Sequence, residues 1–477
     1  MHYLSTRDSG KPPALFSFEE ALIGGLAADG GLYVPQRLPL LDAAGLAALA
    51  GLSYADLAAR IIGLFAGETF AAQELRSLAA AAYRDFRHQA VAPLVQLDRR
   101  LWLLELFHGP TLAFKDLALQ LLGRLFDAVL ARRGEHVTIV GATSGDTGSA
   151  ALAACAACKA IDIFILYPHN RISEVQRRQM TTIAGAHAHA VAIEGTFDDC
   201  QDLVKALFAD RALAAELNLA AVNSINWARI AAQTVYYVAA ALALGGPGRT
   251  LSFAVPTGNF GNAYAAHIAR RMGAPIARLV VATNRNDVLT RYFATGRMAI
   301  AAVEASLSPS MDIQVASNFE RLLFELKGGD GAAVAAAIAA LRKTGALPEN
   351  AAEWRAARRL FSAYRVDDET TMDSIARTYA RSGILIDPHT AVAVAAAEAA
   401  LRQPGAEDDG APMVALACAH PAKFPDTVAR ATGVRPALPA ALGDLAERRE
   451  RFIVLPNDIG SVKGFIRARA RRTRAAA

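Results

Sequence analysis

Cysteine is scarce in this chain, with 4 residues among 477. That number is too small for a disulfide framework, which excludes the class of small disulfide-stapled secreted proteins. Long hydrophobic runs are also missing, because the longest ones, such as residues 235–244, fall short of the roughly 20 residues that span a bilayer. The first eight residues lack the charged-then-apolar layout of a signal peptide. We therefore expect a cytoplasmic protein without a membrane segment.

A large excess of charge of one sign is absent too. The formal net charge is +5, and part of it lies in the C-terminal run Arg467–Arg474. No aromatic residues alternate with these arginines, as they do in many nucleic-acid-binding segments. The run therefore predicts a solvated chain end and no nucleic-acid partner. Apolar residues make up 53% of the chain and charged residues 20%, a balance typical of a globular, helix-rich protein the size of an enzyme.

Patterns of metal ligands are sparse. Cys155 and Cys158 form one CxxC, but it lies in an alanine-rich helical run with no second CxxC nearby, which favours buried core thiols over zinc ligands. His187 and His189 alternate on one face of a predicted strand, where metal binding is conceivable. Because no third ligand is close in the sequence, we favour a strand-edge face and predict no metal site.

Strands and helices alternate through the middle of the chain. Residues 136–140, 161–167 and 190–193 have the composition of strands, and helical patterns occupy residues 149–157, 174–183 and 197–208. A second series runs from a strand at 251–255 through a helix near 262–272 to a strand at 279–283. This alternation predicts parallel sheets covered by helices on both faces, whereas the first ninety or so residues have mainly helical spacing.

Three turns in this α/β region follow a strand and precede a helix, at residues 141–148, 256–262 and 419–425. In open α/β sheets, ligands bind beyond the carboxyl ends of the strands. A glycine-rich turn aims several backbone N–H groups at one spot, and the helix dipole adds positive potential, so such a turn is suited to an anion. Ordinary turn and capping chemistry is the alternative for any single turn.

One lysine, Lys115, stands among apolar neighbours and directly before an acid in the segment HGPTLAFKD, residues 108–116. Burial there would lower the pKa of the lysine from its usual value of about 10.4 and make a neutral amine accessible. A neutral amine can attack a carbonyl group and form a Schiff base. A lysine that extends from a helix flank into solvent is the alternative, but the presence of the three turns in the same chain favours a reactive amine.

The turns lack two common cofactor-binding patterns. The first turn spaces its glycines as GxxxGxxG rather than as the GxGxxG of dinucleotide-binding folds, and none of the turns contains GxxxxGK[ST]. A nicotinamide enzyme or a kinase is therefore disfavoured. A cofactor with its own phosphate and an aldehyde for a lysine fits better, and pyridoxal 5′-phosphate has both.

The motifs HGPTLAFKD, TSGDTG, PTGNFGN, DPHT and AHPAKFPD, in this order, resemble the threonine synthase family. The pattern LxxGLAxDGGLYVP at residues 22–35 and the segment 223–229 extend the resemblance to the branch with a long N-terminal domain. The resemblance implies an α/β protein of pyridoxal-phosphate fold-type II, similar to the tryptophan synthase β subunit, with two parallel-type α/β domains. We expect a helical N-terminal domain at residues 1–95, a catalytic core at 96–430 with a nested subdomain near 135–210, and a C-terminal extension at 431–477.

The resemblance also implies a reaction, in which O-phospho-L-homoserine and water give L-threonine and phosphate by γ-elimination and β-addition of water. Lys115 would be the catalytic residue and would hold the cofactor. Cys418 stands where related enzymes have a serine or threonine facing the pyridine nitrogen. The residues expected to bind the cofactor phosphate are Gly258, Asn259, Phe260, Gly261 and Asn262. Those expected to bind the substrate are Thr143, Ser144, Gly145, Asp146, Thr147, Asn226, Arg229 and Lys423.

Three alternatives stay open at this point. A pyridoxal-phosphate lyase or dehydratase acting on phosphohomoserine, serine or threonine would share the lysine and the phosphate turn, but would release ammonia and an oxo acid. A nucleotide-dependent oxidoreductase would use the turns for a dinucleotide. A binding protein that kept the fold without activity is the third, and the retention of Lys115 with all three turns argues against it.

Overall fold

The computed structural model describes residues 1–183, 185–221, 224–403 and 410–471. The chain forms two compact units. The larger unit comprises residues 1–81, 86–108 and 224–436, and the smaller one comprises residues 82–85, 109–223 and 437–477. Asn223 of the segment quoted above, and Arg472 to Arg474 of the basic run, lie outside the described residues.

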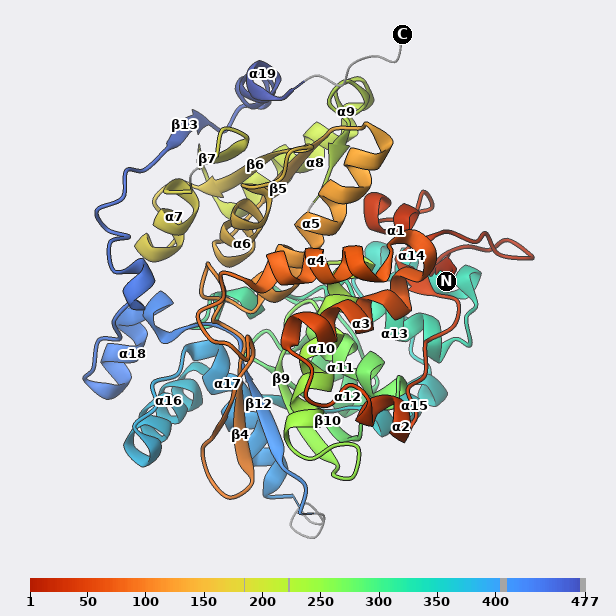
Figure 1. Ribbon diagram of the computed structural model, residues 1–477, viewed down its shortest axis with the longest axis vertical. Coiled ribbons are helices and arrows are strands. Elements are labelled where there is room, and N and C mark those ends of the chain that lie inside the picture. The colour runs from red at the N-terminus through yellow and green to blue at the C-terminus, as the bar shows by residue number, and fades with distance from the viewer. Residues whose placement is uncertain (184, 222–223, 404–409, 472–477) are drawn as a thin grey trace. The chain divides into compact units, whose positions relative to one another are not determined.

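The larger unit contains two sheets and most of the helices (Figure 1). Its strands are β1 (Tyr3–Ser5), β2 (Tyr33–Pro35), β3 (Leu94–Gln96), β4 (Leu101–Glu105), β9 (Leu251–Pro256), β10 (Ile276–Thr283), β11 (Ser362–Arg365) and β12 (Met413–Ala417). Its helices are α1 (Phe18–Gly24), α2 (Ala43–Ala47), α3 (Tyr54–Ala66), α4 (Ala72–Tyr83, which ends in the smaller unit), α10 (Trp227–Ala243), α11 (Gly261–Arg271), α12 (Val288–Thr295), α13 (Phe319–Leu326), α14 (Gly331–Thr344), α15 (Ala351–Leu360), α16 (Asp368–Ser382), α17 (Pro388–Leu401) and α18 (Pro425–Thr432). Three short 3-10 turns are η1 (Gly67–Thr69), η2 (Pro309–Met311) and η3 (Pro421–Lys423).

The main sheet of the larger unit has six strands in the order β11-β10-β9-β12-β4-β3. All neighbouring pairs are parallel except β3 and β4. Strands β9 and β12 are buried along their whole length, as expected for parallel strands covered on both faces, which read as continuous apolar runs. Because β4, β12 and β9 are parallel neighbours, the chain leaves all three at the same edge of the sheet.

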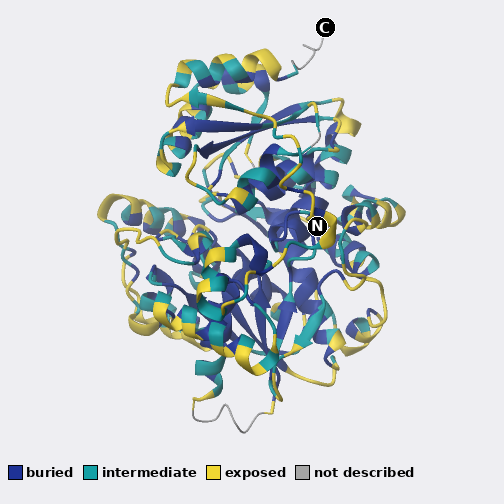
Figure 2. Ribbon diagram, turned by 90° about the vertical axis from the view of Figure 1, so that its left-hand side faces the viewer, coloured by how far each residue is buried: buried dark blue, intermediate teal, exposed yellow. Residues whose placement is uncertain are grey.

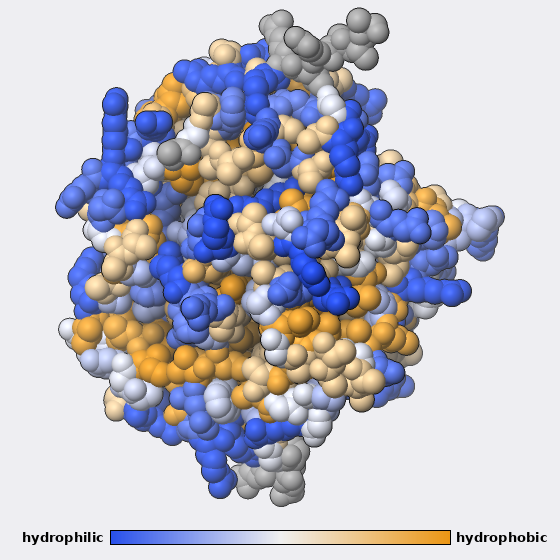
Figure 3. All heavy atoms as spheres, in the orientation of Figure 1, coloured by the Kyte–Doolittle hydropathy of each residue, from blue (hydrophilic) through white to orange (hydrophobic). Residues whose placement is uncertain are grey.

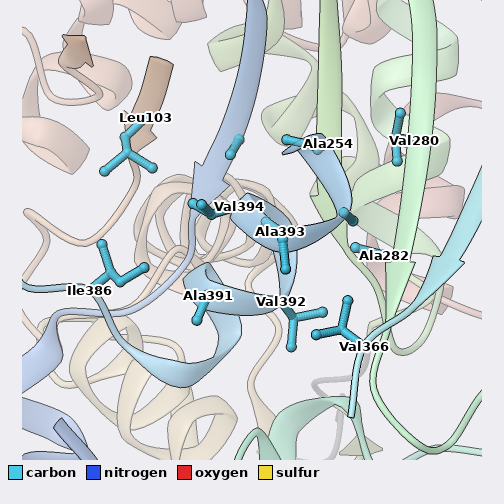
Figure 4. Packing of buried hydrophobic residues seen from close by; sticks show 14 of the residues in the cluster. Leu103, Ala254, Val280, Ala282, Val366, Ile386, Ala391, Val392, Ala393 and Val394 are labelled. Atoms are coloured by element: carbon cyan, nitrogen blue, oxygen red, sulfur yellow. The ribbon is translucent and has the colours of Figure 1, made fainter. Parts of the chain in front are cut away.

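One core cluster of this unit joins the sheet to helix α17. Residues Ala391–Val394 of α17 pack with Leu103 of β4, Ala254 of β9, and Val280 and Ala282 of β10 (Figure 4). The alanines of this helix allow its backbone to lie close to the strands. The packing fixes the start of α17 beside the edge of the sheet where the strands end.

The smaller unit is built around a five-stranded sheet with the order β13-β7-β6-β5-β8. All its pairs are parallel. The strands are β5 (Val137–Ala142), β6 (Ile161–Pro168), β7 (Ala188–Glu194), β8 (Leu219–Ala220) and β13 (Phe452–Pro456). The helices are α5 (Lys115–Arg133), α6 (Asp146–Cys155), α7 (Glu174–Thr181), α8 (Phe197–Ala209), α9 (Arg211–Leu217) and α19 (Ile459–Arg469), with the 3-10 turn η4 (Ala440–Leu442). In both units the strands are mostly buried and the helices expose one side (Figure 2).

The strand and helix alternation predicted from the sequence is confirmed. Strands β5, β6 and β7, and helices α7 and α8, lie at the predicted positions, as do β9, α11 and β10. The helical prediction for the N-terminal residues is confirmed for α1 to α4 but wrong at β1 and β2, which form a short antiparallel pair.

His187 lies directly before strand β7, and His189 is its second residue. Among the described strands, β13 pairs with β7 only from Ala190 onward, whereas β6 pairs with it at His189, which agrees with the predicted strand-edge position. The ring of His189 stacks on Phe164 at 4.5 Å, and His187 Nδ1 lies 3.2 Å from an oxygen of the buried Asp162. Among the described residues, no three His, Cys, Asp or Glu side chains are grouped in a way that could hold a metal ion. Cys155 and Cys158 are buried and reduced, as predicted.

The basic C-terminal run is partly anchored. Arg471 donates from its backbone nitrogen and its Nε to Asp162, at 2.7 and 3.0 Å. The expected solvated end is therefore wrong at Arg471, because the preceding helix α19 packs its Val462 and Ile466 into the core of the smaller unit. Of the described helices, none has the length and hydropathy needed to cross a membrane. Figure 3 shows hydrophobic and hydrophilic residues interspersed on one face, as is usual for protein surfaces.

Candidate active site

Lys115 is the first residue of α5, directly after a tight turn. Asp116 shapes this turn, because its carboxylate accepts hydrogen bonds from the backbone nitrogen and the hydroxyl of Thr111, at 2.8 and 2.7 Å. A Cβ at Gly109 would lie 2.4 Å from the Cβ of Asp116, so only glycine fits there. Leu112 adopts a left-handed conformation with φ of 62°, which is costly for a branched side chain and persists where surrounding contacts enforce it. The backbone before Lys115 is therefore tightly defined.

The ammonium group of Lys115 lies in a mainly apolar setting with one acid beside it. The residue is 8% exposed, and Leu112, Ala113 and Leu117 are fully buried. Nζ lies 4.9 Å from the centre of the Phe114 ring and 3.7 Å from Oδ2 of Asp146. The sequence prediction of an apolar setting is confirmed, and the structure adds the carboxylate of Asp146 to it.

Asp146 is the first residue of α6, directly after the turn that follows β5. Its other oxygen, Oδ1, accepts a hydrogen bond from Nε2 of Gln176 on α7 at 2.9 Å. Gly145, with φ of 138°, lies so close that a Cβ there would be 2.5 Å from the Gln176 side chain. Thr143 closes the turn, since its hydroxyl oxygen accepts from the backbone nitrogens of Gly145 and Gly148, at 3.0 and 2.8 Å. Of the other predicted residues here, Ser144 is exposed and Thr147 is half-buried.

The turn between β9 and α11, residues 256–262, is the main glycine turn of the larger unit. A Cβ at Gly258 would lie 3.0 Å from the carbonyl oxygen of Ser310, and one at Gly261 would lie 3.1 Å from the amide of Asn318. Phe260 is left-handed, with φ of 63°. Its ring is buried and packs on Phe319 and Phe361 at 5.5 and 5.3 Å. Phe260 therefore presents only its backbone to a ligand.

Asn262 lies in the first turn of α11 and is 7% exposed. Its Oδ1 accepts from the hydroxyl of Tyr237 at 2.7 Å and from that of Tyr236. Burial holds the pKa of both tyrosines well above its usual range, so both hydroxyls stay protonated donors. The Nδ2 of Asn262 is buried, and no described residue accepts a hydrogen bond from it. A buried amide donor without an acceptor is costly, and an anion would relieve that cost.

Cys418 and His420 follow the end of β12. Cys418 is buried, and it lies close enough to Tyr236 and Tyr237 to influence the pKa of each. Burial lowers the pKa of His420 to about 4, helped by the positive charge of Arg87 and by His108. Its Nδ1 accepts from the backbone nitrogen of Ala422 at 3.1 Å and caps η3. Lys423, the last residue of η3, is fully buried.

Asn226 and Arg229 lie at the start of α10. Asn226 caps this helix, accepting from the backbone nitrogen of Ala228 at 2.9 Å and donating to the carbonyl of Leu22 at 2.8 Å. Its side chain therefore ties α10 to the N-terminal segment. Arg229 is 3% exposed, and burial lowers its pKa to about 10, so it stays charged at neutral pH. The charge of Arg229 acts on Tyr236, two turns further along the same helix.

Some of the predicted site residues thus come together within each unit. In the smaller unit, Lys115 and Asp146 approach each other, with Gln176 behind the acid. In the larger unit, Asn262, Cys418 and Arg229 gather around Tyr236 and Tyr237. The two tyrosines and Gln176 were not predicted from the sequence. The signal for the tyrosines was a pair of adjacent hydroxyls within an alanine-rich helix.

Family models match consecutive parts of the chain. The model for the threonine synthase N terminus matches residues 2–83, that for pyridoxal-phosphate dependent enzymes matches residues 86–352, and that for the threonine synthase C-terminal region matches residues 390–466. The threonine synthase of Pseudomonas aeruginosa is 54% identical over 98% of both chains. The chain belongs to the threonine synthase family.

Solved structures of the family agree with this membership. A pyridoxal-phosphate-bound threonine synthase from Brucella melitensis has a TM-score of 0.95 at 49% identity and covers 99% of this chain and 100% of its own. The threonine synthase of Escherichia coli has a TM-score of 0.81 at 31% identity and covers 98% of this chain and 100% of its own. The fold is therefore that of the pyridoxal-phosphate fold-type II enzymes, and the cofactor is pyridoxal 5′-phosphate.

The residues of this threonine synthase family member fit that cofactor. The turn at 256–262 carries no ionisable side chain. It ends at a helix N-terminus and adds the buried Nδ2 donor of Asn262. Each of these features suits a phosphate. Lys115 offers a primary amine to an aldehyde from an apolar setting.

Proposed function

We propose that this protein converts O-phospho-L-homoserine and water into L-threonine and phosphate. The observation that carries this proposal is 54% identity to a threonine synthase over nearly the whole of both chains. Lys115, the acid beside it and the glycine turns support it, because they are the parts that such chemistry needs. The full-length match favours this reaction over that of a pyridoxal-phosphate lyase or dehydratase.

We assign the cofactor to three elements of the chain. Lys115 holds its aldehyde, and the turn from Gly258 to Asn262 holds its phosphate through backbone N–H groups and the Asn262 amide. Cys418 faces the pyridine nitrogen, where a thiol is a weaker hydrogen-bond partner than a hydroxyl. When bound, pyridoxal phosphate stabilises negative charge on the substrate carbons.

Nζ of Lys115 moves the protons in this proposal. After the substrate's amino group has replaced it on the aldehyde, Nζ would take the α-proton of the substrate and return protons further along the carbon chain, because it is a primary amine held among buried apolar groups. Asp146, 3.7 Å away, balances the charge of the protonated amine. Asp116 holds the turn in front of Lys115 and so keeps Nζ in place.

The substrate anions meet polar and cationic groups. The turn from Thr143 to Thr147, which includes Ser144 and Gly145, receives the carboxylate and part of the phosphate. Ser144 and Thr147 are the accessible hydroxyls of this turn, because that of Thr143 accepts from two backbone nitrogens. Arg229 and Lys423 supply buried positive charge that stabilises the leaving phosphate. Asn226 contributes by holding the start of α10 on which Arg229 lies.

We infer that the protein acts in the cytoplasm on this small molecule, without a nucleic-acid partner. The small net charge and the anchoring of Arg471 support this inference.

A product assay tests the proposed function. The purified protein is incubated with O-phospho-L-homoserine, and threonine, inorganic phosphate, ammonia and 2-oxo acid are measured together. Equal amounts of threonine and phosphate support the proposal. Ammonia with a 2-oxo acid would identify a lyase instead, and binding of a nicotinamide dinucleotide by a colourless protein would identify an oxidoreductase.

A further inference from the structure

The segment Asp387–Thr390 at the start of α17 is a motif that the proposed function leaves unused. Asp387 is fully buried and caps the helix, accepting from the backbone nitrogens of His389 and Thr390 at 3.0 Å each. Pro388 occupies the first helical position, where the missing N–H is no loss. Capping explains the aspartate and the proline. It does not require a histidine at position 389.

The ring of His389 connects the cap to a distant backbone segment. Its Nδ1 lies 2.7 Å from Oδ2 of Asp387, and its Nε2 accepts from the backbone nitrogen of Ser310 at 3.2 Å. A backbone N–H can only donate, so Nε2 is the acceptor and the ring proton lies on Nδ1, facing Asp387. His389 is 4% exposed and packs on the ring of Phe424 at 5.1 Å. The ring is therefore held in one orientation and one tautomer.

The segment bound by His389 lies against the glycine turn. A Cβ at Gly258 would be 2.9 Å from Ile313, 3.0 Å from the carbonyl oxygen of Ser310 and 3.3 Å from the Cα of Met311. The segment at Ser310 and the turn at Gly258 are in close contact with no space between them. A shift of the segment would therefore move the turn or leave a cavity beside Gly258. On its other side the segment is held through Asp312, whose Oδ1 accepts from Nδ2 of Asn284 at 2.7 Å. His389 thus supports the segment on which Gly258 rests from the side of α17.

We propose that His389 is a positioning residue that sets the shape of the turn at 256–262 and, through it, the affinity for the cofactor's phosphate. The proposal rests on the proposed function, which assigns that phosphate to this turn. His389 acts through Ser310, and Asp387 fixes its tautomer. The packing of α17 on the sheet keeps the histidine in place, because Ala391–Val394 anchor the helix two residues further on (Figure 4).

The test compares pyridoxal 5′-phosphate with pyridoxal, which lacks the phosphate. Both are titrated by absorbance into the full-length chain after removal of its cofactor. H389L removes the acceptor, whereas H389Q keeps an amide oxygen near the position of Nε2. We expect H389L to bind pyridoxal 5′-phosphate about tenfold more weakly, as for one lost hydrogen bond at a buried donor, and to bind pyridoxal unchanged. We expect H389Q to recover most of the lost affinity for pyridoxal 5′-phosphate.

Three outcomes would overturn the proposal. H389L could lose affinity equally for both ligands, which indicates a general structural defect, or keep its affinity for both. H389Q could fail to recover the affinity for pyridoxal 5′-phosphate that H389L loses. H389N, which keeps a polar group beside Asp387 but lacks an acceptor at the Nε2 position, replaces H389L if that variant does not fold, and the same loss is expected. H136L is the matched control, because it breaks another histidine–aspartate pair, of 2.9 Å, in the smaller unit, and it leaves both affinities unchanged. A wild-type protein that prefers pyridoxal 5′-phosphate no more than pyridoxal would instead contradict the assignment of the phosphate to the turn.

Discussion

Each unit places a glycine-rich turn after an interior parallel strand, but the turn at 256–262 has no ionisable side chain whereas the turn at 143–148 contains Asp146. In the turn at 256–262, the buried amide of Asn262 has its oxygen occupied by two tyrosines, and its nitrogen remains a donor. In the turn at 143–148, the carboxylate lies 3.7 Å from the amine of Lys115. The turn of the larger unit thus offers a neutral donor, whereas the turn of the smaller unit pairs its own acid with a lysine.

This difference assigns separate tasks to the two turns. The turn at 256–262 is suited to hold a phosphate that stays in place, because neutral donors there need no counter-ion. The turn at 143–148 already contains a negative charge, so its own acid pairs with the lysine, and we propose that its hydroxyls receive the substrate. The predictions below test this division of tasks.

The largest effect is expected at Lys115. K115A removes the amine that carries the cofactor and moves the protons, so we expect a loss in kcat of at least about 1,000-fold, with the folded structure retained. Steady-state assays of threonine formation and circular dichroism measure the two quantities. K205A, a change at an exposed lysine of the smaller unit, is the control and should leave both unchanged. Substantial activity in K115A would remove the lysine from the mechanism.

N262D tests the turn at 256–262, which has no ionisable side chain. The new side chain still accepts from Tyr236 and Tyr237, but its second oxygen replaces the buried Nδ2 donor with negative charge. We expect affinity for pyridoxal 5′-phosphate to fall by about 100-fold, since both a hydrogen bond and charge balance are lost. N350D, at the exposed N-cap of α15, where asparagine and aspartate cap equally well, is the control. Equal cofactor affinity in N262D and wild type would show that the phosphate lies elsewhere.

D146N tests the turn at 143–148, which contains the carboxylate of Asp146. The amide oxygen of asparagine still accepts from Gln176, but the charge beside Lys115 is lost. We expect kcat to fall by about 10- to 100-fold, while affinity for the cofactor's phosphate stays close to that of wild type. Kinetics and cofactor titration separate the two effects. If D146N weakened phosphate binding as strongly as N262D, the division of tasks between the turns would be wrong.

The lowered pKa of His420 predicts that the free energy of unfolding depends on pH. Burial lowers the pKa of His420 to about 4, from the usual 6.5, so the unfolded chain binds more protons between these values. The free energy of unfolding therefore has its full value above pH 6.5 and falls as the pH drops toward 4. The expected loss is on the order of 2 kcal/mol, because solvent partly screens the charge of the histidine. Urea unfolding at several pH values measures this free energy. H420Q should lose less stability over this range than wild type, and a parallel loss would exclude His420 as the cause.

The smallest effect is expected at Cys418. C418S replaces a thiol with a better hydrogen-bond partner of similar size, and both leave the pyridine nitrogen largely unprotonated. We expect kcat to change by less than about threefold, with a small shift of the visible absorption band. A large loss of activity in C418S would mean that the thiol has a function of its own.

The sequence predicted those parts of the fold that depend on local patterns. The strands at 137–142, 161–168 and 251–256 are mainly apolar, the first and the last of them precede glycine turns, and their positions were predicted correctly. The three turns were predicted to lie beyond strand ends for the same reason. Lys115 was predicted to be buried because apolar residues surround it along the chain.

Features that depend on distant pairing were missed. Strand β13 pairs with β7 more than 250 residues earlier in the chain, and no pattern near residue 452 names that partner. Gln176 was missed because a capping box explains it locally, with Ser173, while its amide nitrogen reaches Asp146 across the fold. The domain boundaries and the site roles remain predictions.

The central claim is that Lys115 holds the cofactor, and one labelling experiment tests it most directly. The yellow protein is reduced with borohydride, digested, and searched by mass spectrometry for a pyridoxyl group. The account predicts one modified peptide, labelled at Lys115, and no label in K115A. Label at another lysine, or a protein that neither absorbs visible light nor takes up pyridoxal 5′-phosphate, would contradict it.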